Sequence, residues 1–411
     1  MKDYLEKHEW KVIERGFHKQ HNKITESIFS IGNGYMGQRG NFEEYYSGES
    51  MQGSYLAGIY YPDKTRVGWW KNGYPEYFAK VLNSVNWIAV DIYLDGKRLD
   101  LAKVEMLEFY RELDMQSSIL KKRIKFKTSE GYVFKIESER FCSRATRELG
   151  CIQYKIRSEY YKGPLSIRSY LDFDVYNEDA NYDEQFWSHL STGKVDNKAF
   201  VESKTRKTDF QVLAMMSTEL NAGGLEAQKD LLEDKLAGVQ YDFFMESGEQ
   251  ITLNKSVVIV SSFYEERDRL KQSAESILRQ AENSSYDELR LSHVSAWDAL
   301  WQESDIKIEG DVSAQQGIRF NIFHLHQTYS GDDARLNIGP KGFTGEKYGG
   351  STYWDTEAYC LPFYLANSDP EVSRKLLKYR HNHLSKAIEN AEKLGFKNGA
   401  ALYPMVTMNG E

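Results

Sequence analysis

The first 264 residues carry a long succession of short strand patterns, and this feature limits the possible folds more than any other part of the sequence. Polar and apolar residues alternate in runs that are rich in β-branched and aromatic side chains, and turn-forming residues separate the runs. Asp95-Gly96 and Glu130-Gly131 are typical of tight hairpin turns. The predicted hairpins join 85–94 to 97–101, 124–129 to 132–137, 152–156 to 165–170 and 239–244 to 251–254. So many hairpins predict a large antiparallel β-sandwich over residues 1–264.

The pattern changes to helical spacing after residue 264. Residues 265–304 contain no proline, and Val294, Trp297 and Trp301 recur at spacings of three and four, which places them on one face of a helix. Asn283-Ser284-Ser285 predicts a break within this stretch. We therefore expect a helical linker, in two pieces, between the sandwich and the rest of the chain.

Residues 305–411 predict a series of helices joined by loops. One helix is expected over 313–329, a second in the segment that follows Trp354, and a third from Asp369-Pro370 towards Gly395. Helices in series are typical of the opening of an (α/α)6 barrel, and three helices cannot close one. The predicted fold class is therefore mixed, β then α: a sandwich, a helical linker and the incomplete start of an α/α barrel.

Composition excludes several classes of function. A chain of 411 residues is long enough for two or three domains, and its net charge of −8 without a basic patch argues against nucleic-acid binding. The N-terminus has no apolar run typical of a signal peptide, and nowhere do eighteen consecutive apolar residues occur, so we expect a cytoplasmic protein with no membrane contact. Cys142, Cys151 and Cys360 lack a CxxC spacing, which favours reduced thiols over disulfides or a zinc site.

Two motifs resemble cofactor or metal sites without the context that such sites need. The run from Gly32 to Gly37 matches G-x-G-x-x-G, but another glycine and no helical stripe follow it, so a tight loop is favoured over the nicotinamide site of an oxidoreductase. His324 and His326 are two residues apart, as are His381 and His383. Residues at this spacing point to different sides of a helix, so no metal site is expected.

The loop 339–350 contains five glycines and leads into Trp354 and Asp355. An aromatic ring can cover the apolar face of a sugar, and a carboxylate can accept hydroxyl hydrogen bonds worth roughly 1.5–3 kcal/mol each. The structural alternative is a core aromatic at Trp354 and a helix cap at Asp355 or Thr356. The residues alone leave both interpretations open. Glu357 lies two residues beyond Asp355 and should face elsewhere, so the two acids are not expected to form a catalytic pair.

Four blocks of sequence, in order along the chain, resemble the glycoside hydrolase family 65 phosphorylases. The blocks are Ser30–Glu44, Tyr61–Pro75, Gly339–Leu365 and Leu402–Glu411. Other members of the family usually carry a histidine before an aromatic-Trp-Asp run, whereas this chain has Gly350-Ser351-Thr352 at that place. In this respect the chain is similar to the maltose-cleaving type.

The resemblance implies a reaction and the roles of particular residues in it. Intact relatives would cleave maltose by inversion with inorganic phosphate, giving β-glucose 1-phosphate and glucose, and would need no other cofactor. Because phosphate is the nucleophile, such an enzyme needs an acid but no base. Trp354 and Asp355 would hold the sugar before the scissile bond. The catalytic glutamate would lie beyond Glu411, so we expect no catalytic residue here and an inactive N-terminal fragment. The family also implies a homodimer.

A different class of function remains open beside this one. The sandwich could serve as a non-catalytic carbohydrate-binding or assembly module, and sugar binding without turnover would favour that interpretation. Trp69 and Trp70 lie in a loop-like run that could reach over a neighbouring active site or pack a domain interface. The sequence does not decide between these two roles.

Overall fold

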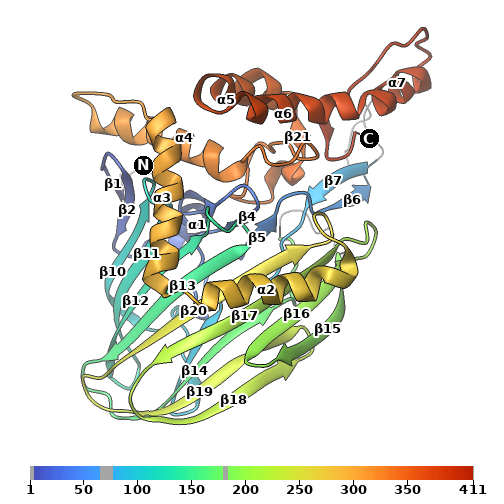
Figure 1. Ribbon diagram of the computed structural model, residues 1–411. Helices are drawn as coiled ribbons and strands as arrows, with labels where there is room; N and C mark the ends of the chain where they lie inside the picture. The colour runs from blue at the N-terminus through green and yellow to red at the C-terminus, as the bar shows by residue number, and fades with distance from the viewer. Residues whose placement is uncertain (1–3, 65–76, 179–183, 411) are drawn as a thin grey trace.

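The computed structural model describes residues 4–64, 77–178 and 184–410. Trp69 and Trp70 lie outside the described residues. The described chain forms two large sheets, three small ones and a set of helices, and the helices of residues 312–393 gather at the opposite end of the molecule from β18 and β19 (Figure 1). All recorded strand pairs in the two large sheets are antiparallel. The predicted class, a large antiparallel β-sandwich followed by helices, is confirmed.

The larger sheet has ten strands, and its last strand in sequence lies near its middle. The order is β1 (Leu5–Glu6), β2 (Lys11–Arg15), β10 (Glu105–Asp114), β11 (Ile119–Lys127), β12 (Val133–Cys142), β13 (Leu149–Ser158), β20 (Gln250–Ser261), β17 (Gln211–Asn221), β16 (Lys198–Thr205) and β15 (Trp187–Val195). Strand β20 therefore joins two groups of strands that are each built from neighbouring parts of the sequence.

The second sheet of the sandwich has five strands, in the order β18 (Leu225–Glu233), β19 (Leu236–Met245), β14 (Gly163–Asp172), β8 (Val90–Leu94) and β9 (Lys97–Arg98). The small sheets are β3 (Ile31–Gly32) with β4 (Met36–Gln38) and β5 (Ser54–Leu56), β6 (Tyr60–Lys64) with β7 (Tyr77–Val81), and β21 (Thr352–Tyr353) with β22 (Val406–Thr407). They lie between the sandwich and the C-terminal helices (Figure 1).

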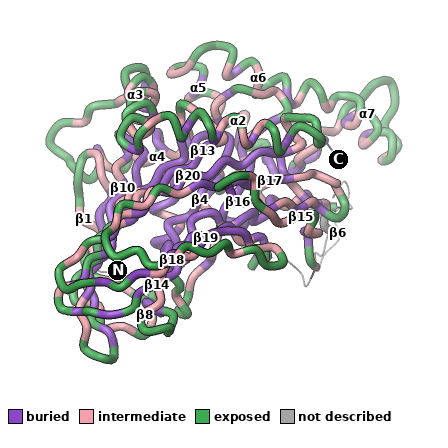
Figure 2. The backbone as a smooth tube through the Cα atoms, turned by 60° about the horizontal axis from the view of Figure 1, so that its bottom comes forward, coloured by how far each residue is buried: buried purple, intermediate pink, exposed green. Residues whose placement is uncertain are grey.

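The ten-stranded sheet is apolar on both faces. Along β20, Val257 and Ile259 point into the main core, whereas Val258 and Val260 belong to a second apolar cluster on the other face. This alternation follows from the two-residue period of a strand. The second cluster is covered by helix α2 (Leu270–Glu282), which lies across the sheet (Figure 1). Figure 2 shows the resulting continuous buried interior of the sheets.

Two of the predicted hairpins are confirmed, and two are wrong. Strand β11 pairs with β12, and β8 pairs with β9 across Asp95 and Gly96, whose φ angles of +48° and +77° fit a type I′ turn. The pairing of 152–156 with 165–170 is wrong, because β13 and β14 belong to different sheets. The pairing of 239–244 with 251–254 is wrong for the same reason, since β19 and β20 also lie in different sheets. In both cases a short connection carries the chain from one sheet to the other.

The helical linker is present, and its predicted break is confirmed. Helix α2 ends at Glu282, and α3 (Tyr286–Ser304) begins with a capping box between Ser285 and Glu288. Trp297 is fully buried, and the Trp301 indole donates a hydrogen bond of 3.1 Å to the Met115 carbonyl. The linker helices therefore pack on the sandwich and do not act as a free spacer.

The C-terminal helices follow the predicted series with two differences. Helix α4 (Val312–Thr328) matches its prediction, and the second helix begins as a π-helical turn, Thr356–Cys360, before α5 (Leu361–Asn367). The third predicted helix is divided into α6 (Pro370–Asn382) and α7 (Leu384–Lys393), because His383 leaves the helical conformation. Short helical segments are α1 (Asn22–Ile28) and the 3-10 turns Lys19–His21, Arg267–Arg269 and Lys347–Gly350. Over the described residues, no helix combines the length and apolarity needed to cross a membrane.

Candidate functional site

The glycine-rich loop lies between the sandwich and the helices and leads into β21. Gly342 and Gly350 have φ angles of +49° and +68°, as the sequence predicts for such a loop. A Cβ at Gly350 would lie 2.4 Å from the Cβ of Val81, and a Cβ at Gly342 would lie 2.3 Å from the Oγ1 of Thr328. At these two positions the glycines let the loop pack closely against β7 and α4.

Trp354 and Asp355 follow β21 directly and are both open to solvent. The Trp354 side chain is not in the core, because the residue is 51% exposed. Asp355 is also exposed, and within the described chain its side chain makes no capping hydrogen bond. The Thr356 hydroxyl instead donates a hydrogen bond of 2.8 Å to the Ile338 carbonyl. The possible helix cap at Asp355 or Thr356 is therefore wrong, because Asp355 has helical backbone angles in place of the extended backbone of a capping residue. The helix opens with a wider π-helical turn.

Glu357, the acidic residue that follows the Trp354-Asp355 pair, has a different environment. Glu357 forms an ion pair with Arg380 of α6, with an Nε–Oε1 distance of 2.9 Å and an Nη2–Oε2 distance of 3.0 Å. Asn337 donates a further hydrogen bond of 3.3 Å to Glu357 Oε1. Sequence reasoning did not identify Arg380 or Asn337, because the partners are 20 and 23 residues from Glu357 and no local pattern marks them.

Cys360 and His326 are not activated for nucleophilic chemistry. Burial raises the pKa of the Cys360 thiol, and the nearby charges of Glu357 and Asp355 raise it further. A thiol with a raised pKa is a weak nucleophile at neutral pH. Burial lowers the pKa of His326 to about 4, and its Nε2 lies 3.0 Å from the Ser304 hydroxyl. This histidine is therefore neutral and ties α4 to the linker helix α3.

His324 and His383, from the two histidine pairs of the sequence analysis, behave in the same way. Burial lowers the pKa of His324 and of His383 to about 4. The ring of His383 packs edge-on against Tyr379 at 4.5 Å. Among the residues that the structure describes, no group of three histidine, cysteine, aspartate or glutamate side chains is placed to hold a metal ion.

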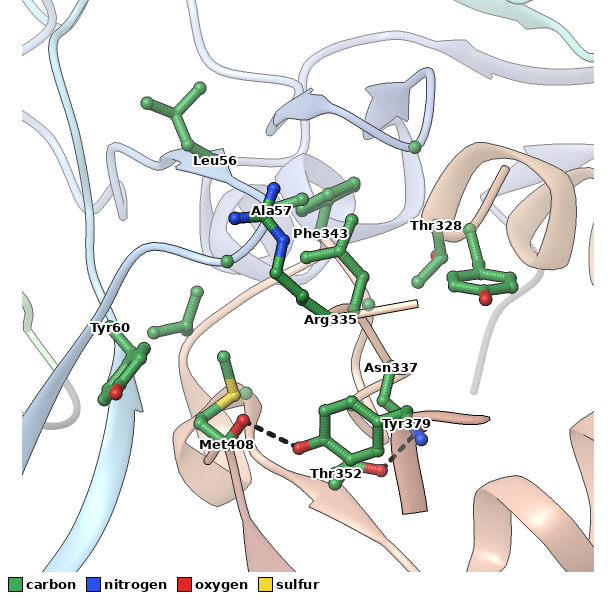
Figure 3. A pocket seen from close by; sticks show the side chains of 18 of the residues that line it. Leu56, Ala57, Tyr60, Thr328, Arg335, Asn337, Phe343, Thr352, Tyr379 and Met408 are labelled. Atoms are coloured by element: carbon green, nitrogen blue, oxygen red, sulfur yellow. Dashed lines mark hydrogen bonds between the residues drawn. The ribbon is translucent and has the colours of Figure 1, made fainter. Parts of the chain in front are cut away.

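A small cavity lies close to the site, at the junction of the sandwich and the helices (Figure 3). Its volume is about 70 Å³, which is room for a few water molecules but not for a sugar. Thr352 donates a hydrogen bond of 2.7 Å to Asn337 Oδ1, and Tyr379 donates one of 2.7 Å to the Met408 carbonyl. Trp354 and Asp355 do not line this cavity. The cavity therefore belongs to the packing between the glycine-rich loop and the neighbouring elements, and the exposed pair lies outside it.

The glycine motif near the N-terminus is a tight hairpin. Gly32 ends β3 and Gly37 lies in β4, and the two residues pair with each other. Gly34 has a φ of +88°, and a Cβ at Gly37 would lie 2.1 Å from the Cβ of Phe343. The hairpin thus packs against the glycine-rich loop, with no helix opening after it as in a dinucleotide fold.

The described chain combines a large β-sandwich with the opening helices of a second domain and an exposed Trp-Asp pair. The N-terminal domain of glycosyl hydrolase family 65 matches residues 12–300, and the central catalytic domain of the same family matches residues 319–411. This chain belongs to glycosyl hydrolase family 65.

Individual relatives support the same assignment. The chain is 44% identical over 408 residues to the maltose phosphorylase of Bacillus subtilis, covering 98% of this chain and 53% of the relative. It is 33% identical over 409 residues to the kojibiose phosphorylase of Caldanaerobacter subterraneus, covering 96% of this chain and 51% of the relative. A solved structure described as a candidate kojibiose phosphorylase from the human microbiome matches with a TM-score of 0.89 and 29% identity, over 99% of this chain and 53% of that one. The chain spans about half the length of the curated relatives it matches.

Proposed function

We propose that this chain supplies the sugar-binding part of a disaccharide phosphorylase, with Trp354 and Asp355 as the residues that hold the glucosyl unit. The maltose and kojibiose phosphorylases among the relatives favour phosphorolysis of a disaccharide as the reaction class. The relative with 44% identity is a maltose phosphorylase, which favours maltose as the disaccharide. The products would be β-glucose 1-phosphate and glucose.

The observation that supports this proposal most is the exposure of both residues of the Trp-Asp pair. A buried ring would have packed the core and a capping carboxylate would have stabilised the helix start, but neither residue is used in that way. An exposed indole offers a flat apolar surface to the C–H face of a pyranose ring. An exposed carboxylate next to it can accept hydrogen bonds from the sugar hydroxyls.

In this assignment the described residues bind and orient the sugar. Inversion requires phosphate to attack the anomeric carbon from the face opposite the leaving oxygen, while an acid protonates that oxygen. Asp355 is assigned to the sugar, and both carboxylate oxygens of Glu357 accept hydrogen bonds from Arg380. We therefore assign the proton donor to neither residue and expect no turnover by these 411 residues alone.

Sugar binding tests the assignment directly. We would titrate the 411-residue chain with maltose and with glucose by isothermal calorimetry. Asp355→Asn keeps the size of the side chain but removes its charge, and it should weaken binding about tenfold, because a hydrogen bond to a charged group is about 1–1.5 kcal/mol stronger than a neutral one. Trp354→Ala should abolish measurable binding. Tyr160→Ala removes an aromatic that is 75% exposed on the sandwich and is the matched control.

A second measurement tests whether a proton donor is already present among these residues. Glucose release should be followed with maltose, kojibiose and trehalose, each with and without inorganic phosphate. Binding without release agrees with both the expected missing acid and a non-catalytic carbohydrate-binding module. Phosphate-dependent release by this chain would show that a carboxylate already present is the proton donor. If neither sugar binds and both site variants match the wild type, the assignment of Trp354 and Asp355 is wrong.

The family resemblance also supports a homodimeric, cytoplasmic protein, and both features belong to the proposal. Light scattering on the purified chain measures the oligomeric state. A monomer at micromolar concentration would contradict the dimer for this chain.

A further inference from the structure

We propose that Glu357 and Arg380 form a positioning pair that holds Trp354 and Asp355 in the orientation in which they bind the sugar. The inference rests on the proposed function, because it assigns to the ion pair the task of presenting the sugar-binding residues. Neither Glu357 nor Arg380 needs to touch the sugar for this role.

Arg380 and Glu357 form a bidentate ion pair. The Nε and Nη2 atoms of Arg380 donate to the two carboxylate oxygens of Glu357 at 2.9 and 3.0 Å. The two side chains are only 12% and 24% exposed, so water competes weakly for these bonds. Two parallel charge-assisted hydrogen bonds fix the relative orientation of the two groups as well as their distance.

The same guanidinium also holds the backbone next to Trp354. Arg380 Nη2 donates a hydrogen bond of 3.0 Å to the Tyr353 carbonyl, which is part of the peptide bond that joins Tyr353 to Trp354. One guanidinium therefore contacts the chain just before Trp354 and, through Glu357, just after Asp355. Rotation of the Trp-Asp pair about its backbone would break at least one of these contacts.

A loop residue completes the support from the other side. Asn337 donates to Glu357 Oε1 at 3.3 Å and accepts a hydrogen bond of 2.7 Å from Thr352. Thr356 is tied to the Ile338 carbonyl in the same loop. Three separate segments, the loop at 337–338, the stretch 352–357 and helix α6, thus meet around the backbone that carries the two proposed sugar ligands.

One nitrogen of the Arg380 guanidinium has no partner in the described part of the chain, which indicates that the other two nitrogens set the position of the group. Arg380 Nη1 is buried and has no hydrogen-bond partner among the described residues. A buried donor without a partner is unfavourable, so the contacts of the other two nitrogens to Glu357 and Tyr353 must set the position of the group. A lysine would keep the positive charge but could not donate in the plane of the carboxylate and to the carbonyl from separate nitrogens.

A second ion pair on the same helix provides the control. Arg374 lies 2.8 Å from Glu371, three residues away on α6, and the two side chains are 75% and 56% exposed. Arg374→Lys therefore makes the same chemical change as Arg380→Lys on the same helix, at a pair that does not join separate segments. Any general effect of replacing an arginine by a lysine on helix propensity should be equal in the two variants.

The test uses a signal from Trp354 itself. The chain has eight tryptophans, and 5-fluorotryptophan labelling gives each of them a 19F resonance that Trp354→Phe assigns. In Arg380→Lys we expect the Trp354 resonance to broaden or split, and the maltose affinity read from that resonance to fall about tenfold. In Arg374→Lys both should match the wild type. The other tryptophan resonances report whether the fold is intact.

Each outcome decides between the alternatives. If Arg380→Lys leaves the Trp354 resonance and the maltose affinity unchanged while the wild type binds maltose, the pair is only a stabilising contact and the inference is overturned. If Arg380→Lys fails to fold, Glu357→Gln carries the same test, because it keeps the shape of the carboxylate and one acceptor. If the wild-type Trp354 resonance does not respond to maltose or glucose, the proposed function fails, and the positioning role fails with it.

Discussion

The buried His293 makes the packing of helix α3 on the sandwich sensitive to acid, and His293→Gln should remove part of that sensitivity. His293 Nδ1 accepts a hydrogen bond of 3.0 Å from the Arg144 backbone N–H, and Nε2 lies 3.3 Å from the Ser118 carbonyl. The ring must therefore accept at one nitrogen and donate at the other, which only the neutral form can do. Burial lowers the pKa of His293 to about 3.

The direction and size of the effect follow from proton linkage. Above about pH 6.5 the ring is neutral in both the folded and the unfolded chain, so the full stability is present. Below that pH the unfolded chain binds a proton that the folded chain excludes, and the free energy of unfolding falls by about 1.4 kcal/mol per pH unit until the folded pKa is reached. Between pH 7 and pH 5 His293 alone should cost about 2 kcal/mol, out of the total of about 5–15 kcal/mol usual for a domain.

Urea unfolding followed by tryptophan fluorescence at pH 7 and pH 5 measures this loss. The amide of His293→Gln can accept from Arg144 and donate to Ser118 but cannot bind a proton. Its free energy of unfolding should therefore fall by about 2 kcal/mol less than that of the wild type over the same pH interval. His381→Gln, on the exposed side of α6, is the control and should behave as the wild type does. An equal loss in His293→Gln and in the wild type would refute the reasoning.

Three further variants test the packing around the site and in the sandwich. Gly37→Ala should destabilise the protein by about 1–3 kcal/mol, because its Cβ would meet Phe343, whereas Gly317→Ala, with open space around it in α4, should be neutral or stabilise by up to about 1 kcal/mol. Calorimetric melting temperatures compare the two, and equal values would contradict the close approach. Lys122→Met leaves the buried carboxylates of Glu43 and Glu44 without their shared ammonium partner and should cost about 3–5 kcal/mol in urea unfolding. A Lys122→Met variant as stable as the wild type would contradict the expected cost of removing this shared ion-pair partner.

Local sequence signals correctly predicted a turn and a helix break that depend on neighbouring residues. The turn at Asp95-Gly96 and the break before Ser285 were both readable, because each is set by a few adjacent side chains. The pairing of β13 and β14 was predicted wrongly, because a short connection can either close a hairpin or cross to the other sheet. Which of the two occurs depends on pairing with strands that are distant in the sequence, such as β20. The local sequence carries no signal for that pairing.

At the candidate site, too, residues marked by a local motif were predicted and contacts set by distant residues were not. The sequence and the family resemblance identified Trp354 and Asp355, and their role in sugar binding stays a prediction. The helix cap at Asp355 was wrong, because a capping residue needs an extended backbone, and the backbone of Asp355 is already helical. The ion pair between Glu357 and Arg380 could not be foreseen, since it depends on how α6 packs against the stretch 352–357.

The central place of β20 has a consequence for how the protein is made. Translation delivers β10 to β13 first and β15 to β17 later, and the strand that joins these two groups is the last of the ten to be synthesised. Until residue 261 has left the ribosome, β13 and β17 each present a long open edge with apolar side chains on both faces. Such edges are templates for pairing with other chains. The nascent protein should therefore depend on chaperones up to the moment when β20 inserts, and far less afterwards.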